Sequence, residues 1–191
     1  MIFLDPDLDP HPALTSTAAK SAVVSGPATL PKNLRLPSPR TLNRFLAEAQ
    51  AAVRLKGEVS VLLTTDAAIR KLNTRFRHKN KATDVLSFPA EGIGAEEIAG
   101  DLAISAPTAR RQAVEQGHSL SPEIKVLILH GLLHLNGYDH VTDNGKMARR
   151  ERLLRGKLGL PKGLIERAEA PKPPRSPKAG TRKVAAKAKR P

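Results

Sequence analysis

The chain has 191 residues, of which 40% are hydrophobic and 3% aromatic, with a net charge of +14 at pH 7 and no cysteine. This length fits one domain of ordinary size with tails, and the lack of cysteine excludes a disulfide framework or a thiolate metal site. The longest apolar run, residues 126–129, is too short for a transmembrane helix, and the N-terminus lacks the features of a secretory signal, so we expect a cytoplasmic protein.

The positive charge is concentrated at the end of the chain. Residues 171–191 contain eight Lys or Arg and no acidic residue, which leaves a net charge of +6 on the preceding part. A protein with this charge collects near polyanions, of which nucleic acid is the commonest. The Pro, Ala, Lys and Arg composition after about residue 170 cannot bury a core, so this tail is predicted to be disordered.

The first predicted elements are an edge strand, an irregular insertion and a helix. Residues 1–4 suit the strand, and residues 5–37 are rich in Pro, Ala and Ser without a sustained period. Ser38 and Pro39 suit the start of the helix, and Gly57 suits its stop. The apolar stripe of this helix has helical spacing and consists of Leu42, Phe45, Leu46, Ala49 and Val53.

Alternating apolar residues predict a strand over residues 59–63. Asp66 is expected to cap the next helix, which should bury one face. That face carries Ile69, Leu72 and Phe76. A second strand follows at residues 85–88, so this segment predicts a βαβ unit with parallel strands.

The loop 91–97 is expected to lead into a strand at 98–104, and Ser105 to cap a helix that ends at Gly117. Ser121 and Pro122 suit the start of the next helix. This helix is apolar on nearly every side, which is typical of a buried helix.

A last helix is predicted from about residue 143 to 158, and Gly159 closes it. Its composition is basic, with few acidic residues. The cations are Lys146, Arg149, Arg150, Arg152, Arg155 and Lys157. Together with the tail they are expected to contact RNA without sequence preference, in a salt-dependent way.

The strongest chemical signal is the run HGLLHLNGYDH, which contains His130, His134 and His140. His130 and His134 are four residues apart and therefore lie one turn above each other on one helix face. Gly137 suits the end of that helix and lets the chain double back, which brings His140 to the other two. Three converging imidazoles predict a metal site, best a single Zn²⁺ with one coordination position open for water.

Two core histidines satisfied by their neighbours are the alternative interpretation. The third histidine favours the metal, because two imidazoles on a hydrocarbon helix are costly unless something binds them. The spacing equals that of the metzincin proteases, whose motif has a glutamate beside the first histidine as general base. This chain has Gly131 there, which argues against peptide cleavage. Three neutral ligands leave the zinc charge uncompensated and suit an anionic substrate such as a phosphodiester.

A second stretch, residues 72–89, places several cations at the end of a helix, just before a strand. Arg75, Arg77, Lys79 and Lys81 can bind phosphates there, and an arginine does so bidentately. A charged loop that is only solvated is the alternative.

The two stretches together resemble one family, the YbeY ribonucleases, which mature ribosomal RNA in bacteria. HGLLHLNGYDH resembles the family signature, LNTRFRHKNKATDVLSFP its second motif, and Gly100-Asp101-Leu102 its third. The resemblance covers roughly residues 42–160. The chain departs from the family after His140, where acidic residues are usual and Val141-Thr142 here leads into a basic helix.

The resemblance implies an α/β fold, a single compact domain with a small mixed, about four-stranded sheet packed with helices. It implies a single-strand-specific, zinc-dependent endoribonuclease that acts on ribosomal RNA, especially the three-prime end of the small-subunit RNA. One Zn²⁺ would be held by His130, His134 and His140, and the family's functionally important arginine falls on Arg77, which would bind the scissile phosphate. Implied partners are ribosomal RNA, ribosomal subunits and ribosome-associated factors, with no membrane and no DNA.

We therefore divide the chain into an N-terminal strand with an insertion (1–37), a nuclease domain (38–165) and a basic tail (166–191). The general base is unassigned: Asp84, Asp101 and Asp139 are candidates by chemistry, and Asp139 has a competing role in orienting a histidine. One alternative is a non-catalytic, zinc-stabilised RNA-binding assembly factor. The other is a hydrolase of peptides or small esters with a distant base. Imidazole ligands also suit nickel, copper and iron.

Overall fold

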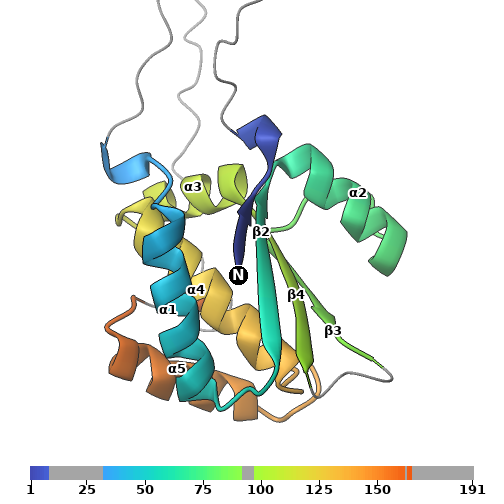
Figure 1. Ribbon diagram of the computed structural model, residues 1–191, viewed down its shortest axis with the longest axis vertical. Helices are drawn as coiled ribbons and strands as arrows, with labels where there is room; N and C mark the ends of the chain where they lie inside the picture. Colours follow the sequence, from blue (N-terminus) through green and yellow to red (C-terminus); the bar gives the residue numbers. More distant parts are fainter. Residues whose placement is uncertain (9–31, 92–96, 162, 165–191) are drawn as a thin grey trace, which may run out of the picture.

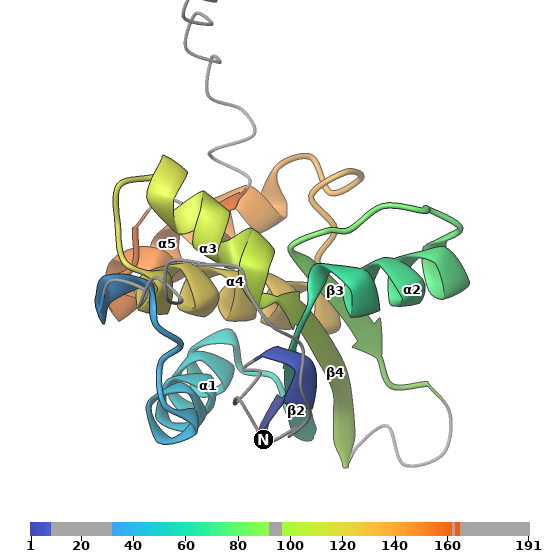
Figure 2. The same cartoon turned by 90° about the horizontal axis from the view of Figure 1, so that it is seen from above.

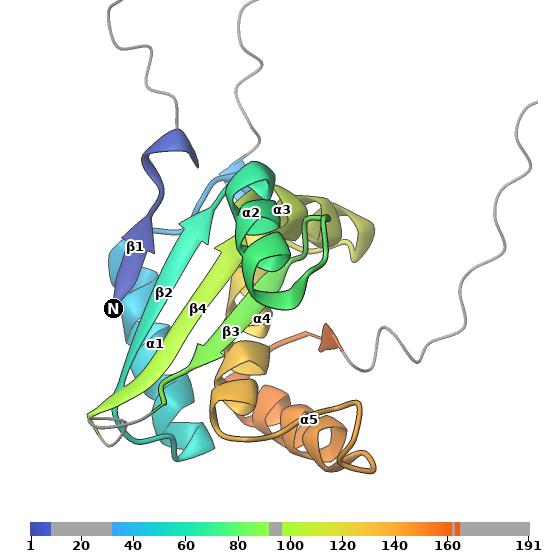
Figure 3. The same ribbon diagram turned by 90° about the vertical axis from the view of Figure 1, so that its right-hand side faces the viewer.

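A computed structural model describes residues 1–8, 32–91, 97–161 and 163–164. Its sheet has the strand order β1-β2-β4-β3 (Figure 3). The strands are β1 (Ile2–Leu4), β2 (Glu58–Thr64), β3 (Val85–Pro89) and β4 (Ile98–Ser105). The first three in this order are parallel, and β3 is antiparallel to β4. The expected α/β class with a small mixed sheet is confirmed; most of the predicted insertion and the whole predicted tail lie outside the described residues.

Helices cover both faces of the sheet. On one face lie α1 (Pro39–Val53) and α4 (Leu120–Leu135), and on the other lies α2 (Asp66–Arg77) (Figure 1). Two further helices, α3 (Ala106–Glu115) and α5 (Lys146–Leu158), pack against α4 (Figure 2). Short 3-10 turns form at Pro6–Leu8 and Lys32–Leu34. None of the described helices combines the length and hydrophobicity that a membrane-crossing segment needs.

The main core lies between the sheet and the helices α1 and α4. The predicted stripe of α1 is buried in it, and α4 is buried almost all round, as its apolar composition predicts. A smaller core under α2 consists of Ile69, Leu86 and Ala103. The prediction for Phe76 was wrong: its side chain is 53% exposed and meets the edge of the Phe88 ring, with the ring centroids 5.1 Å apart.

The predicted parallel βαβ unit is also wrong. The strand β3 does not pair with β2, because β4 lies between them, and β3 runs antiparallel to β4. The short connection after β3 returns the chain directly alongside itself, so the hairpin pairing decides the direction of β3. The parallel partner of β2 is β4.

Several helix ends differ by a few residues from their predicted positions. Thr65 is the N-cap of α2 and Asp66 its first residue; α4 begins after Ser119, ahead of the predicted Ser121. The helix α1 ends at Arg54, which adopts a left-handed conformation, so Gly57 follows the helix and does not stop it. At α2 the cap is Thr65 because its side chain accepts from the Ala68 N–H, whereas Ser119 makes no side-chain capping hydrogen bond.

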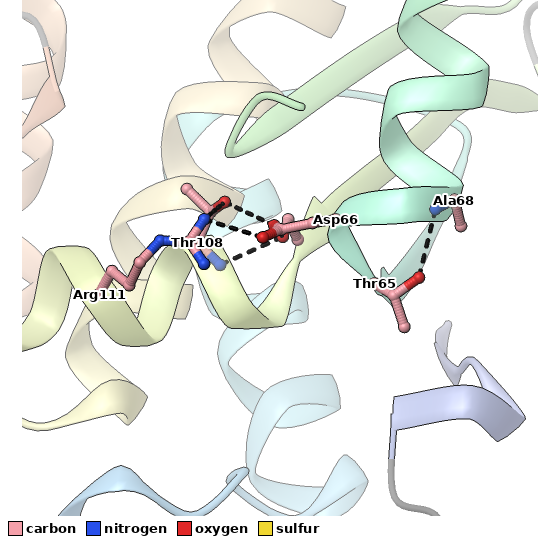
Figure 4. A network of polar contacts seen from close by, with 6 residues as sticks. Thr65, Asp66, Ala68, Thr108 and Arg111 are labelled. Atoms are coloured by element: carbon pink, nitrogen blue, oxygen red, sulfur yellow. Dashed lines mark hydrogen bonds and ion pairs between the residues drawn. The ribbon is translucent and has the colours of Figure 1, made fainter. Parts of the chain in front are cut away.

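A network around Asp66 joins the starts of α2 and α3 (Figure 4). The hydroxyls of Ser105 and Thr108 both donate to Asp66 Oδ1, and Arg111 Nη2 lies 2.9 Å from Oδ2. Burial by itself would raise the pKa of Asp66, but these hydrogen bonds and the Arg111 charge lower it overall. Thr65 completes the start of α2 by accepting from the Ala68 N–H.

We expect Asp66→Asn to lower the free energy of unfolding by about 1 kcal/mol at pH 7, since its side chain is 36% exposed and water screens the charge. A lowered pKa means that this stability is present above the ordinary value of 3.8 and is lost as the pH falls through the lower folded value. Urea unfolding between pH 7 and pH 3 measures both effects. Glu115→Gln, an exposed change on α3, serves as control. If the difference in unfolding free energy between Asp66→Asn and the wild type does not change with pH, the expectation is wrong.

Gly100 lets β3, β4 and the end of α4 approach one another. Its φ is +139°, and a Cβ there would lie 2.3 Å from Phe88 O and 3.0 Å from Leu135 Cδ2. The first contact is with backbone, which cannot move aside without disturbing the hairpin.

Gly100→Ala is therefore expected to destabilise the fold by about 3 kcal/mol. Gly156→Ala is the matched control: this glycine lies in α5, and a Cβ there would meet nothing within 4 Å, so alanine should stabilise by about 0.5–1 kcal/mol. Thermal and urea unfolding of both variants test whether the change in unfolding free energy has opposite signs at the two positions. Equal stability of Gly100→Ala and the wild type would refute the packing argument.

Candidate metal centre

The centre is built on α4, which lies very close to the sheet. A Cβ at Gly131 would come within 2.7 Å of Leu102 Cδ2 and 2.9 Å of Cδ1, so this helix position faces β4 and has no room for a side chain. His130, the neighbouring residue, is consequently turned away from the sheet toward α5. The packing of one glycine thus sets the rotation of the helix that carries the histidines.

Three histidines converge at the C-terminal end of α4. His130, His134 and His140 each offer a ring nitrogen, and these atoms all lie within 4.8 Å of one another. The Nε2 atoms of His130 and His134 are 3.1 Å apart. Two nitrogens bound to one tetrahedral zinc lie about 3.3 Å apart, so the observed separation fits a shared metal.

The chain bends back immediately after α4 and carries His140 to the other two rings. Gly137 has a φ of +82°, and the N–H of Tyr138 donates to Leu133 O at 3.0 Å. Asp139 then fixes the loop, because its carboxylate accepts from the Val141 N–H and the Thr142 hydroxyl. The predicted reversal at Gly137 is confirmed.

The three rings differ in their exposure to solvent. His130 is buried, His134 half-buried and His140 exposed, so the group opens toward water on the His140 side. Burial, and then the neighbouring imidazoles of His130 and His140, lower the pKa of His134 to about 4. The His134 ring is therefore neutral at pH 7, and it has a lone pair for a metal.

Glu151 is a neighbour of the histidine group that the sequence analysis missed. It lies on α5, is 1% exposed, and its Oε1 is 3.1 Å from His130 Nδ1. Among the described residues no fourth histidine or carboxylate joins the ligand group. The donor set is thus three imidazoles, with a carboxylate behind one of them, and these residues fit a zinc ion well.

A signal for Glu151 does exist in the sequence. It falls at the position between Met147 and Leu154 on the apolar stripe of α5, both of which are buried. Because cations surround Glu151 in the sequence, the local pattern suggests an exposed ion pair. Only the packing of α5 on α4 shows that the Glu151 side chain is buried. Arg155 was also misjudged as a surface cation: it is 7% exposed and donates to Pro161 O.

The structure keeps Arg77 apart from the histidines. Arg77 is the last residue of α2, on the other face of the sheet from α4, and within the described ranges it makes no hydrogen bond or ion pair with them. The basic loop that follows is held by Asn73, which is 2% exposed. Its side-chain amide donates to Lys81 O, and its backbone carbonyl accepts from the Lys79 N–H. The exposed guanidinium is therefore presented at the edge of an ordered loop.

The three candidate bases lie in different surroundings. Asp84 accepts from Thr83 and Gln112 and holds the start of β3, and Asp101 points to the α2 side of the sheet, opposite to Leu102. Asp139 alone lies beside the histidines, where it holds the His140 loop. Its pKa is lowered, first by the Val141 N–H and the Thr142 hydroxyl and then by the charges of His134 and His140.

The packing of Gly131 against Leu102 also explains why this chain cannot carry the metzincin glutamate beside its first histidine. A glutamate at position 131 would point into Leu102 and β4, away from the histidine nitrogens. Within the described residues, no glutamate joins the three histidines as a further candidate ligand. A peptidase base at the metzincin position is therefore sterically excluded from this chain.

Comparison with known proteins finds one family. A family model described as "Endoribonuclease YbeY" matches residues 32–159. A protein of that name from Koribacter versatilis is 51% identical, over 74% of this chain and 91% of its own. Another, from Solibacter usitatus, is 49% identical over 73% of this chain and 90% of its own. A solution structure from Thermotoga maritima covers 64% of this chain and 85% of its own, with 26% identity and a TM-score of 0.47.

Proposed function

Because the chain belongs to the endoribonuclease YbeY family, we propose that it is a zinc-dependent endoribonuclease that cleaves single-stranded RNA in ribosomal RNA processing. One observation carries the metal dependence: three imidazoles converge, with their ligand atoms within 4.8 Å, on a group that opens to solvent. A centre with three protein ligands and a free position is typical of catalytic zinc, whereas structural zinc has four protein ligands.

The proposed metal ligands are His130, His134 and His140. Zinc held there supplies a Lewis acid that polarises a phosphoryl oxygen and promotes the ionisation of water near neutral pH. The chain contributes the orientation of the three rings and, at His130, the buried partner Glu151. None of the three ligands is negative, so the site keeps its attraction for the anionic backbone of RNA.

A basic hollow between the loop after α4 and the helix α5 supports RNA as the substrate. This hollow of about 360 Å³ is lined by Tyr138, Lys146, Arg149, Arg150 and Leu153. Tyr138 is two residues from His140 and offers a ring for base stacking, while the cations suit phosphates.

Arg77 is proposed to bind the scissile phosphate and to stabilise the negative charge that develops in the transition state. Its support is an exposed guanidinium on an ordered basic loop. Because α2 and α4 lie on opposite faces of the sheet, Arg77 would reach a scissile phosphate held at the histidines across the free edge of β3.

The proposed substrate is ribosomal RNA, with the three-prime end of the small-subunit RNA as the processing site and ribosomal subunits as partners. This activity would belong in the cytoplasm. The net charge of +14 supports a polyanionic partner such as ribosomal RNA. The non-catalytic assembly factor remains the alternative outcome of the first experiment below.

His134→Ala should lose the metal and the cleavage together, because two remaining imidazoles bind zinc weakly. We expect about one zinc per chain in the wild type, little in the variant, and at least about 100-fold slower cleavage of a single-stranded RNA. Elemental analysis and a single-turnover cleavage assay measure the two quantities. His118→Gln, a histidine outside the group, should keep both. Metal loss with unchanged cleavage would exclude the catalytic role, and a metal-loaded wild type that only binds RNA would favour the assembly factor.

Arg77→Ala is expected to lower kcat by about 100-fold, the usual effect of removing a group that stabilises transition-state charge. Arg77→Lys should recover only part of this rate, since an ammonium lacks the bidentate fork. Steady-state cleavage kinetics separate the effects, with Lys71→Ala on the exposed side of the same helix as control. A rise in KM at constant kcat would instead assign Arg77 to a phosphate that does not react.

A further inference from the structure

The buried carboxylate of Glu151 needs an explanation beyond packing. It is 1% exposed in a helix that carries most of its charges outward, and burying a carboxylate is costly unless it is hydrogen-bonded. Its Oε1 lies 3.1 Å from Nδ1 of His130, which is itself 5% exposed. Of the three histidines, the one that is buried is therefore also the one with a carboxylate behind it.

This contact decides which nitrogen of His130 is free. A carboxylate accepts hydrogen bonds, so the proton of the neutral ring lies on Nδ1, and the lone pair lies on Nε2. That Nε2 is the atom that faces His134 Nε2 at 3.1 Å. Without Glu151, the ring can exchange tautomers and rotate, and each change takes the lone pair away from the site.

The chain beyond α5 closes the back of the same carboxylate. A Cβ at Gly163 would lie 2.2 Å from Glu151 Oε2 and 3.0 Å from Arg155 Nε. Arg155 is 7% exposed and donates its Nη1 to Pro161 O at 2.5 Å, which holds this segment in place. Pro161 and Gly163 thus lie against the Glu151–Arg155 side of α5, and there is no room for a side chain at Gly163.

We propose that Glu151 is a positioning residue that fixes the tautomer and orientation of His130 for metal binding, and that Gly163 seals it in place. The inference rests on the proposed metal centre. It makes zinc affinity depend on α5 and on the segment that follows it, neither of which contributes a ligand. Loss of such a partner typically weakens metal binding by about 10- to 100-fold.

A matched pair of variants tests this assignment. Glu123, near the start of α4, is 0% exposed, and its Oε2 lies 3.1 Å from Nε2 of the partly exposed His118, so the chain has a second buried glutamate paired with a histidine, away from the metal centre. We expect Glu151→Gln to weaken zinc binding by about 10- to 100-fold, and Glu123→Gln to bind zinc like the wild type. Both should lower thermal stability to a similar degree.

Zinc affinity is measured on the metal-free full chain by competition with a chromogenic chelator, and folding by circular dichroism. Nitrogen NMR of the histidine rings adds a direct readout: His130 should be the Nδ1–H tautomer in the wild type and a mixture in Glu151→Gln. If Glu151→Gln does not fold, Gly163→Ala replaces it, because the added Cβ displaces the Glu151 carboxylate. Its zinc affinity is then compared with that of Gly156→Ala, where a Cβ meets nothing within 4 Å.

The outcomes are distinct. Wild-type zinc affinity in folded Glu151→Gln would overturn the positioning role and leave the metal centre intact. Equal loss of affinity in Glu123→Gln would also overturn it, because general destabilisation would then be the cause. A wild type that binds no zinc would overturn the metal centre and this assignment with it.

Discussion

The close approach of α4 to the sheet at Gly131 and Leu102 is the constraint on which the rest of this structure depends. A helix that is apolar on all sides has no preferred solvent face, so composition does not fix its rotation. The missing side chain at position 131 lets the helix settle against β4 in one orientation. That orientation turns His130 and His134 away from the hydrocarbon of the sheet and toward polar partners on α5 and on the loop after α4.

The end of α4 converts this packing into a site. Gly100 lets the Leu135 side chain, at the end of α4, pack close to the β3–β4 hairpin, and the bend at Gly137 carries His140 back to the other two histidines. The three histidines therefore come from a rigid, buried helix and from a loop whose backbone is held by Asp139. A centre of this kind combines a fixed geometry with an open side that a large substrate can reach.

The helix α5 has two roles on two faces. Its outward cations, Lys146 and Arg149, line the basic hollow beside Tyr138, whereas its inward Glu151 meets His130. One helix thus links the surface that would hold RNA to the group that would hold the metal. Arg155 belongs to the inner set, although its charge alone suggests the outer one.

Much of the protein could be predicted from local sequence. The stripe of α1, the reversal at Gly137 and the grouping of His130, His134 and His140 all depend on residues a few positions apart, whose spacing sets their geometry directly. The α/β class with its small mixed sheet was expected from the family resemblance. The direction of β3, the exposure of Phe76 and the partner of His130 depend on segments far apart in the chain. Nothing in the local pattern specifies which strands pair or which helix covers which face. The sequence by itself therefore determined the group of three histidines and the buried helix that carries two of them, while only the tertiary structure decided that Glu151 lies behind His130, because α5 and α4 meet through long-range packing.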